Sequence, residues 1–370
     1  MRIQSTTATT SRQDPYVLHR LALLPTIDPL PADAIRAALQ QMTPEELNEL
    51  LHFIYQNKLQ FFWLKALRAI PDLPFPKATE DQLKNDCFRK SALYLMQKKT
   101  IIELDALLEK ERIPYVLFKG THTRELVYDE PAFRPAVDID LLVSDNDKLR
   151  TIRLLSANDY ALGPNQETVS HEVGLVKNNV HIDLHWHIMR PGRTRIELTE
   201  LFLQSRQRYD FFWGLDNETT LLVLLSHPVF TKYATGPQSS IIWFVDLKEW
   251  ISKRTINWQR LLQLLEDSGL KTPAWIMATV LDDLTGCQLP VFVQQAVTPN
   301  NLKNLLLQKW LKMNLSDRFA DHPFLSKYIF TLLAHDSIQD VYKFFRVFRE
   351  ERKKETKMME RLQQVSQQQL

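Results

Sequence analysis

The sequence predicts an α+β protein in which a small mixed sheet lies between an N-terminal helical segment and a C-terminal helical domain. Apolar residues keep helical spacing over most of the chain, but short, wholly apolar runs typical of buried strands appear in its second quarter. Glycine contributes only 8 of 370 residues, which disfavours a loop-rich all-β fold and a glycine-rich phosphate loop. We expect a flexible tail and entry at 1–40, helices at 41–110, an α/β core at 111–195 and a helical domain at 196–370.

The composition is that of a globular protein, with 44% hydrophobic and 24% charged residues. The formal net charge of +2 shows no basic excess, so nothing indicates a protein that coats nucleic acid. Cys87 and Cys287 lie too far apart in sequence for a metal-binding or redox motif. No uncharged run reaches the ~18 residues that a membrane-spanning helix requires. We therefore expect a cytoplasmic protein without a transmembrane segment.

The N-terminal helical segment begins with a clear start signal. In Thr43-Pro44-Glu45-Glu46, a capping threonine precedes proline at the first helical position and glutamate at the third. Apolar residues then keep helical spacing to about Ile70, where three prolines between residues 71 and 76 form a linker. A second helix is expected from Thr79 to about Lys110.

The core should contain four strands. They are a run at 114–118, a run at 134–143, and a hairpin with arms at 172–177 and 180–188 that turns at Asn178-Asn179. Later segments return to helical spacing, and Thr298-Pro299 is interpreted as another helix start. A last, basic helix from about Asp340 is either a solvated terminal helix or a surface for nucleic acid, an acidic partner or a membrane.

Two aspartates on the second strand indicate a metal site. Asp138 and Asp140 are separated by one residue among apolar neighbours, so their carboxylates leave the same face of the strand, ~7 Å apart. Burying two like charges is costly unless a cation joins them. Oxygen ligands at strand ends favour Mg²⁺ or Mn²⁺. The alternative is a strand end with two solvated aspartates.

The second arm of the hairpin alternates strictly between apolar and polar residues. Its polar face carries His181, Asp183, His185 and His187. If this strand pairs beside the first aspartate strand, Asp183 completes a three-carboxylate cluster. Such a cluster can hold two metals roughly 3.5–4 Å apart for an in-line displacement at phosphorus. The alternatives are a zinc or manganese site built from His181, Asp183 and His185, and a polar, partly exposed strand face.

Taken in order, these segments resemble a known family. The residues concerned are Phe118-Lys119-Gly120, Tyr128, the run from Arg134 to Val143, and Ile182-Asp183-Leu184-His185-Trp186. They look like the uncharacterised nucleotidyltransferase family of bacteria, a branch of the polymerase β nucleotidyltransferase superfamily. The resemblance extends from about residue 43 to residue 290, and it includes the segments around Ser226-His227 and Phe244-Val245-Asp246.

The resemblance implies metal-dependent transfer of a nucleoside monophosphate from an NTP, expected to be ATP, to a hydroxyl-bearing acceptor, with release of pyrophosphate. Asp138 and Asp140 would bind both metals, while Asp183 would bind the catalytic metal and help to deprotonate the acceptor. The wider superfamily has Gly-Ser where this chain has Lys119-Gly120. A lysine charge would there replace the serine hydroxyl at the triphosphate, and Gly120 would let the helix N-terminus approach the phosphates.

Several residues and functions stay open at this point. Arg134 is counted with the nucleotide-binding residues, where it either braces a phosphate or pairs with a carboxylate. His185, His227 and Asp246 are left outside the site, since isolated polar residues on such elements are more often structural. The acceptor is expected to be a small molecule, peptide or protein rather than a nucleic acid. The alternatives to the transferase are a catalytically inactive nucleotide-binding or regulatory protein of the same fold, and a histidine/aspartate metal hydrolase.

Overall fold

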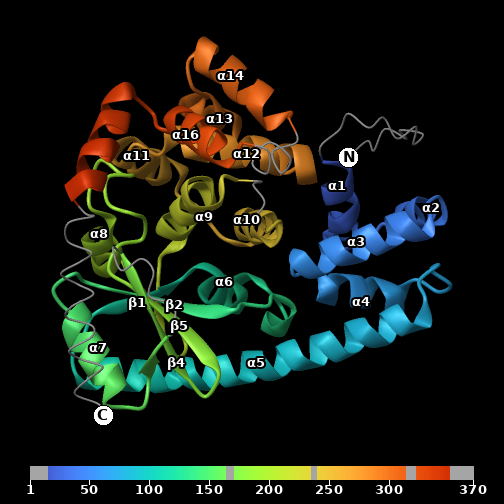
Figure 1. Cartoon of the computed structure of the whole chain (residues 1–370), viewed down its shortest axis with the longest axis horizontal. Helices are drawn as coiled ribbons and strands as arrows, with labels where there is room; N and C mark the ends of the chain where they lie inside the picture. The colour runs from blue at the N-terminus through green and yellow to red at the C-terminus, as the bar shows by residue number, and fades with distance from the viewer. Residues whose placement is uncertain (1–15, 164–170, 235–239, 314–321, 351–370) are drawn as a thin grey trace.

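The computed structural model describes residues 16–163, 171–234, 240–313 and 322–350. Its centre is a seven-stranded mixed sheet with the strand order β3-β4-β5-β2-β1-β7-β6. The long helix α5 (Lys77–Lys110) runs below the sheet, and the C-terminal helices stack above it (Figure 1). The predicted α+β architecture is confirmed.

The sheet contains the predicted strands and three short additional ones. The strands are β1 (Tyr115–Phe118), β2 (Asp138–Val143), β3 (Ala161–Leu162), β4 (Glu172–Lys177), β5 (Val180–His185), β6 (Gln207–Arg208) and β7 (Trp213–Gly214). The hairpin turn is confirmed, because Asn178 and Asn179 have φ values of 50° and 64°, as a type I′ turn requires. The segment expected to form a helical domain after residue 195 is mostly helical but also contains two short strands. β6 and β7 extend the sheet from that region, and two-residue strands are too short to show an alternating pattern.

The two faces of the sheet pack against different helices. Ile139, Leu141 and Val143 of β2 share a core with α5 and with α7 (Lys148–Ser156). Leu142, on the opposite face, belongs to the core of the C-terminal helices. Because side chains alternate along a strand, Asp138 and Asp140 lie on the face of Leu142. The acidic side chains therefore point toward the helical domain rather than toward α5.

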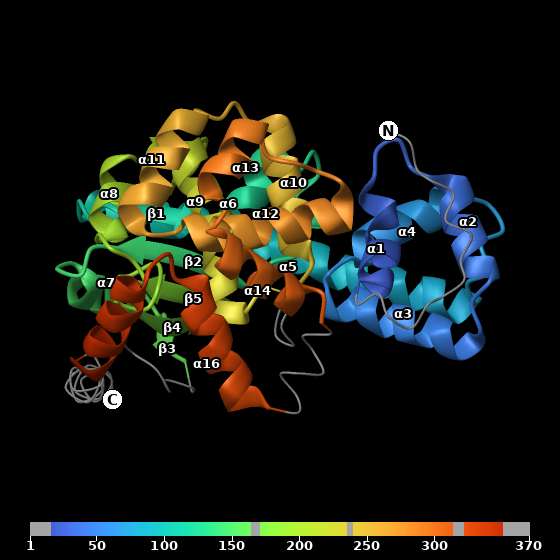
Figure 2. The same ribbon diagram turned by 90° about the horizontal axis from the view of Figure 1, so that it is seen from above.

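The N-terminal helices form a separate group at one end of α5 (Figure 2). They are α1 (Val17–Leu23), a 3-10 helix (Leu24–Thr26), α2 (Ala32–Gln40), α3 (Pro44–Gln56) and α4 (Gln60–Ala69). The capping box is confirmed: Thr43 Oγ1 accepts from the Glu46 N–H, and Glu46 Oε2 accepts from the Thr43 N–H. The expectation of one helix up to Ile70 is wrong, because the chain breaks at Lys58, which has a φ of 62°.

The predicted flexible tail at 1–40 is partly wrong. Residues 1–15 lie outside the described part of the chain. The helices α1 and α2 follow, and they bury Leu23, Ile35 and Leu39 in the main core. These apolar side chains supply the burial that orders the segment.

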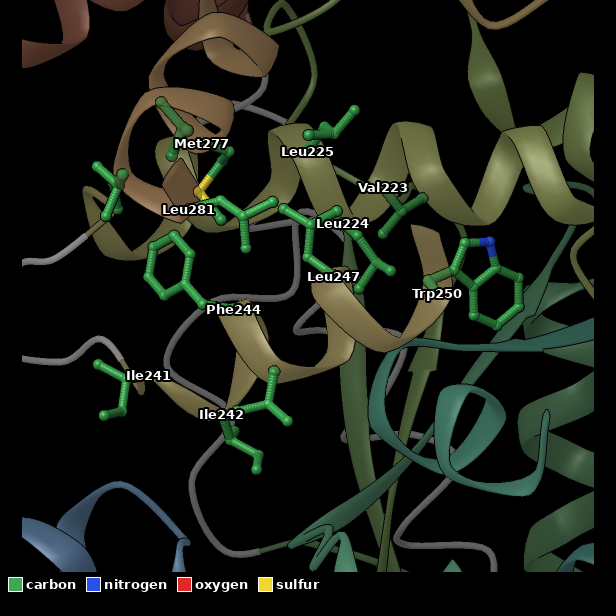
Figure 3. Close-up of a cluster of buried hydrophobic side chains, with 14 of the residues drawn as sticks. Val223, Leu224, Leu225, Ile241, Ile242, Phe244, Leu247, Trp250, Met277 and Leu281 are labelled. Atoms are coloured by element: carbon green, nitrogen blue, oxygen red, sulfur yellow. The ribbon is translucent and has the colours of Figure 1, made fainter. Parts of the chain in front are cut away.

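The helical domain is built on a buried core formed by three helices. Figure 3 shows side chains of α9 (Asn217–Lys232), α10 (Ile242–Lys253) and α12 (Lys271–Thr285) in contact, including Leu225, Phe244, Leu247, Met277 and Leu281. The remaining C-terminal helices are α8 (Leu198–Gln204), α11 (Trp258–Ser268), α13 (Val291–Val297), α14 (Asn301–Leu311), α16 (Pro323–Ala334) and a helix at 338–350. Between the sheet and this domain lies α6 (Lys119–Val127).

Two expectations at the C-terminal end need correction. Thr298 ends α13 instead of starting a helix; the side chain of Asn300 caps α14 by accepting from the Lys303 N–H. The basic helix is not simply solvated where it is described. Its Lys343 Nζ donates to the carbonyls of Thr194 and Arg195 at 3.1 and 2.8 Å. No described helix is long and apolar enough to cross a membrane.

Candidate active site

The acidic residues meet because β2 and β5 are parallel neighbours. Their register places Asp140 directly opposite Asp183, and Asp138 opposite His181. Adjacent strands lie about 4.8 Å apart, so Asp140 and Asp183 form a carboxylate pair on one face of the sheet. Asp138 joins them on that face from two positions earlier on β2. The pairing on which the three-carboxylate prediction depended is therefore present.

Lys119 provides a positive charge at this cluster. Phe118 ends β1 opposite Asp140, so the next residue is carried to the edge of the carboxylates. Lys119 Nζ donates to Asp140 Oδ1 at 2.6 Å. The backbone of Lys119 has a φ of 57°, in the left-handed region that lysine rarely adopts. This turn starts α6 immediately beside the acidic residues.

Gly120 makes room for an arginine. A side-chain carbon at position 120 would lie 2.4 Å from Arg134 Nη1, so only glycine fits against this guanidinium. Arg134 itself is 3% exposed and pairs with Asp246 of α10 through Nη2 to Oδ2 at 2.6 Å and Nε to Oδ1 at 3.0 Å. Of the two roles considered for Arg134, the structure contains the pairing with a carboxylate. Tyr128 also donates to Asp246 Oδ1, at 2.8 Å.

The carboxylate cluster carries more negative charge than its surroundings neutralise. Burial and the neighbouring Asp140 raise the pKa of Asp138. Burial, together with Asp138 and Asp140, raises the pKa of Asp183 to about 8. Burial alone would lower the pKa of Lys119, but Asp140 and Glu172 keep it above its ordinary value. The cluster thus favours any further cation that can enter it.

His185 lies in contact with two of the acidic residues. Its Nε2 is 3.1 Å from Asp140 Oδ1, and its Nδ1 is 3.0 Å from Glu172 Oε2. Burial holds the pKa of His185 well below its ordinary value, and Lys119 acts in the same direction. A neutral imidazole has a single N–H, so it donates to one carboxylate and presents a bare nitrogen toward the other. Potential ligand atoms of Asp140, Asp183 and His185 all lie within 4.8 Å of one another.

A large pocket opens over these side chains. Its volume is about 990 Å³, and it is lined by residues of the sheet, the N-terminal helices and the helical domain. The sequence-predicted residues among the lining are Lys119, Gly120, Arg134, Asp138, Asp140 and Asp183. Such a volume lies at the upper end of the range for small-molecule sites.

Several residues of this site were not placed in it from the sequence, among them His185, which contacts Asp140, and His227, which lines the pocket. Glu172 pairs with His185 across β4 and β5, but a single glutamate near a strand end carries no distinguishing pattern. Lys58 reaches the pocket from the break between α3 and α4, which interrupts an otherwise continuous helical pattern. Asp246 falls outside the predicted site because an isolated polar residue on a helix is more often structural, and its partner Arg134 lies 112 residues away. A motif within one element could have revealed none of these contacts.

The mixed sheet, its facing carboxylates and the lysine-glycine turn define a protein of the nucleotidyltransferase class. A family model described as an uncharacterised nucleotidyltransferase matches residues 43–286. The chain belongs to this family. A comparison with curated proteins gave no significant match.

Proposed function

We propose that the protein transfers a nucleoside monophosphate from an NTP to a hydroxyl group of an acceptor and releases pyrophosphate. The observation that carries this proposal is the pairing of Asp140 with Asp183 on parallel strands, with Asp138 on the same face. Together they collect three carboxylates at one point beside Lys119. This is the arrangement that metal-assisted displacement at phosphorus requires.

The residues present fit a divalent metal ion. The donor set is rich in carboxylate oxygens, which favours Mg²⁺ or Mn²⁺. Burial, and after it repulsion between the neighbouring carboxylates, raises the pKa values of Asp138 and Asp183, and a bound cation would relieve both effects. Asp138, Asp140 and Asp183 would hold the metal. When bound, it would neutralise phosphate oxygens and make the acceptor hydroxyl more acidic.

The chain's own groups account for the remaining steps. Lys119 would move from Asp140 to the triphosphate, and the backbone N–H groups at the start of α6 would face its oxygens. The carboxylate of Asp183 would accept the proton of the acceptor hydroxyl. The acceptor oxygen forms a bond to the α-phosphorus as the bond to the β-phosphate oxygen breaks, so pyrophosphate leaves with that electron pair. Gly120 and Arg134 shape the turn rather than contact the reacting atoms.

The proposal is tested by following which phosphate of ATP is transferred to the product. The protein with Mg²⁺ and a cell extract is given ATP labelled at the α- or the γ-phosphate, followed by the other NTPs. We expect the α-label to appear in a new product and the γ-label in pyrophosphate. The Asp140→Asn variant should produce neither labelled species. Transfer of the γ-label instead would make the protein a kinase, and the absence of transfer with all four NTPs would overturn the proposal in favour of a regulatory nucleotide-binding role.

The second candidate is a metal hydrolase, favoured by the proximity of His185 to Asp140 and Asp183. His181, the other proposed histidine ligand, is exposed and lies opposite Asp138 rather than beside His185. Elemental analysis of the purified protein separates the two candidates. About one tightly held zinc per chain, retained through dialysis, would support the hydrolase, whereas a readily exchanged Mg²⁺ or Mn²⁺ would support the transferase.

A further inference from the structure

One wall of the pocket is cationic, and no described carboxylate forms an ion pair with its side chains. We define the cationic wall as Arg190, Arg193, Lys232 and Lys327, all of which line the pocket. The two arginines follow β5, Lys232 is the last residue of α9, and Lys327 lies on α16. Within the described ranges, none of the four forms an ion pair with a carboxylate, in contrast to Lys119 and Arg134 in the same pocket.

Arg193 is held in place by aromatic rings, and one of its guanidinium nitrogens has no hydrogen-bond acceptor in the described part of the chain. Its guanidinium carbon lies 3.9 Å from the ring centre of Phe344 and 5.0 Å from that of Phe230. Its Nη1 atom is buried and has no hydrogen-bond partner among the residues that the structure describes. A buried, unsatisfied charged donor is costly. A ligand oxygen at this position would satisfy it.

The cationic wall lies within electrostatic reach of the acidic cluster. Burial lowers the pKa of His171 to about 4, Glu172 opposes the change, and Arg190 and Lys119 reinforce it. His171 immediately precedes β4, whose Gly174 pairs with Asp183. Arg190 and Asp183, the proposed proton acceptor, also line the same pocket. A group bound at the cationic wall would belong to the molecule that approaches Asp183.

We propose that the cationic wall binds a phosphate group carried by the acceptor, so that the acceptor is a phosphorylated small molecule. This inference rests on the proposed function. Four cations without acidic partners in the described ranges match a dianionic phosphate better than a single carboxylate. Arginine suits phosphate because its planar donors bind two oxygens at once. The triphosphate of the NTP is assigned to Lys119 and the start of α6. A pocket of about 990 Å³ has room for both molecules.

The test measures binding of inorganic phosphate by calorimetry to the full-length protein. Phosphate is titrated into the protein first without other ligands and then in the presence of saturating Mg²⁺ and a non-hydrolysable ATP analogue. We expect phosphate to bind in both states. Arg193→Gln and Lys232→Gln should each weaken phosphate about tenfold, the effect of losing about 1.4 kcal/mol. Their affinity for the Mg²⁺–analogue complex should stay within about twofold of wild type. Lys309→Gln, at an exposed position on α14, should change neither affinity.

Two results would overturn the inference. If the analogue displaces phosphate and both variants lose affinity for the analogue, the cationic wall holds the triphosphate instead. If both variants are folded and bind phosphate as wild type does, no phosphate site exists there. Lys232→Gln guards against a folding defect, because Arg193 is stacked on Phe230 and Phe344 whereas Lys232 has no such contact among the described residues. Failure of the Mg²⁺–analogue complex to bind wild type would count against the proposed function alone, since phosphate is titrated separately.

Discussion

Replacing Asp183 by asparagine should remove a pH-dependent loss of stability in the metal-free protein. Asp183 has its pKa raised to about 8 in the folded state, while an unfolded aspartate titrates near ~3.9. The folded protein therefore binds this proton more tightly than the unfolded chain does. The resulting stabilisation is complete below about pH 4 and is lost as the pH rises through about 8. Asparagine cannot ionise, so the variant lacks this dependence.

The magnitude follows from proton linkage. Between pH 6 and pH 8 the unfolded aspartate is already ionised, whereas Asp183 in the folded protein still holds most of its proton until the pH nears its pKa of about 8. The free energy of unfolding then falls by up to about 1.4 kcal/mol per pH unit, or about 2 kcal/mol over the interval after allowing for partial ionisation near the folded pKa. The free energy of unfolding of Asp183→Asn should therefore rise by about 2 kcal/mol relative to that of wild type between pH 6 and pH 8.

Urea denaturation in EDTA at pH 6 and pH 8, followed by tryptophan fluorescence, measures the difference. Asp145→Asn is a matched control, because Asp145 follows β2 and its side chain is 57% exposed; its pH dependence should equal that of wild type. Mg²⁺ should reduce the loss in wild type, because a metal binds the ionised carboxylate. Parallel pH dependence of wild type and Asp183→Asn in EDTA would refute the reasoning.

Two further substitutions test the contacts of Lys119 and Arg134. Lys119→Ala should weaken binding of a Mg²⁺ complex of a non-hydrolysable NTP about tenfold, because one charge-assisted contact is lost. Binding of Mg²⁺ alone should not weaken, since Lys119 Nζ no longer competes for Asp140. Calorimetry that shows wild-type affinity for the nucleotide would rule out this role. Asp246→Asn should lower the free energy of unfolding by about 3–5 kcal/mol, because it strands the buried Arg134 charge. Glu249→Gln on the same helix should cost below about 1 kcal/mol, and equal losses in the two variants would contradict a special role for Asp246.

Much of the fold could be predicted from local patterns. The β4–β5 hairpin was predictable because paired asparagines accept the positive φ values of its turn. The aspartate strand was predictable because its other residues are apolar. The break between α3 and α4 was not, because Lys58 adopts a left-handed backbone without glycine or proline to signal it. Tertiary packing decides that conformation, and local spacing does not record it.

In the site, too, some residues could be predicted from local pattern and others depend on tertiary packing. The alternation of polar residues on β5 placed Asp183 on one face, but only the parallel register brings it beside Asp140. The contact of His185 with Glu172 depends on how β4 pairs with β5, and that of Arg134 with Asp246 depends on the docking of α10. Contacts between elements far apart in the chain have no periodic signal. This is why the sequence pointed to the carboxylates and not to their partners.

The close fit of Arg134 against Gly120 restricts how this sequence can evolve. A residue larger than glycine at position 120 would collide with the guanidinium, so it becomes acceptable only after Arg134 has been replaced. That replacement would leave Asp246 as an isolated charge in the interior. Each single change is therefore harmful on its own, and Arg134 and Asp246 should be exchanged together. Relatives of this chain that lack the arginine should also lack the aspartate, and only among them should the glycine vary freely.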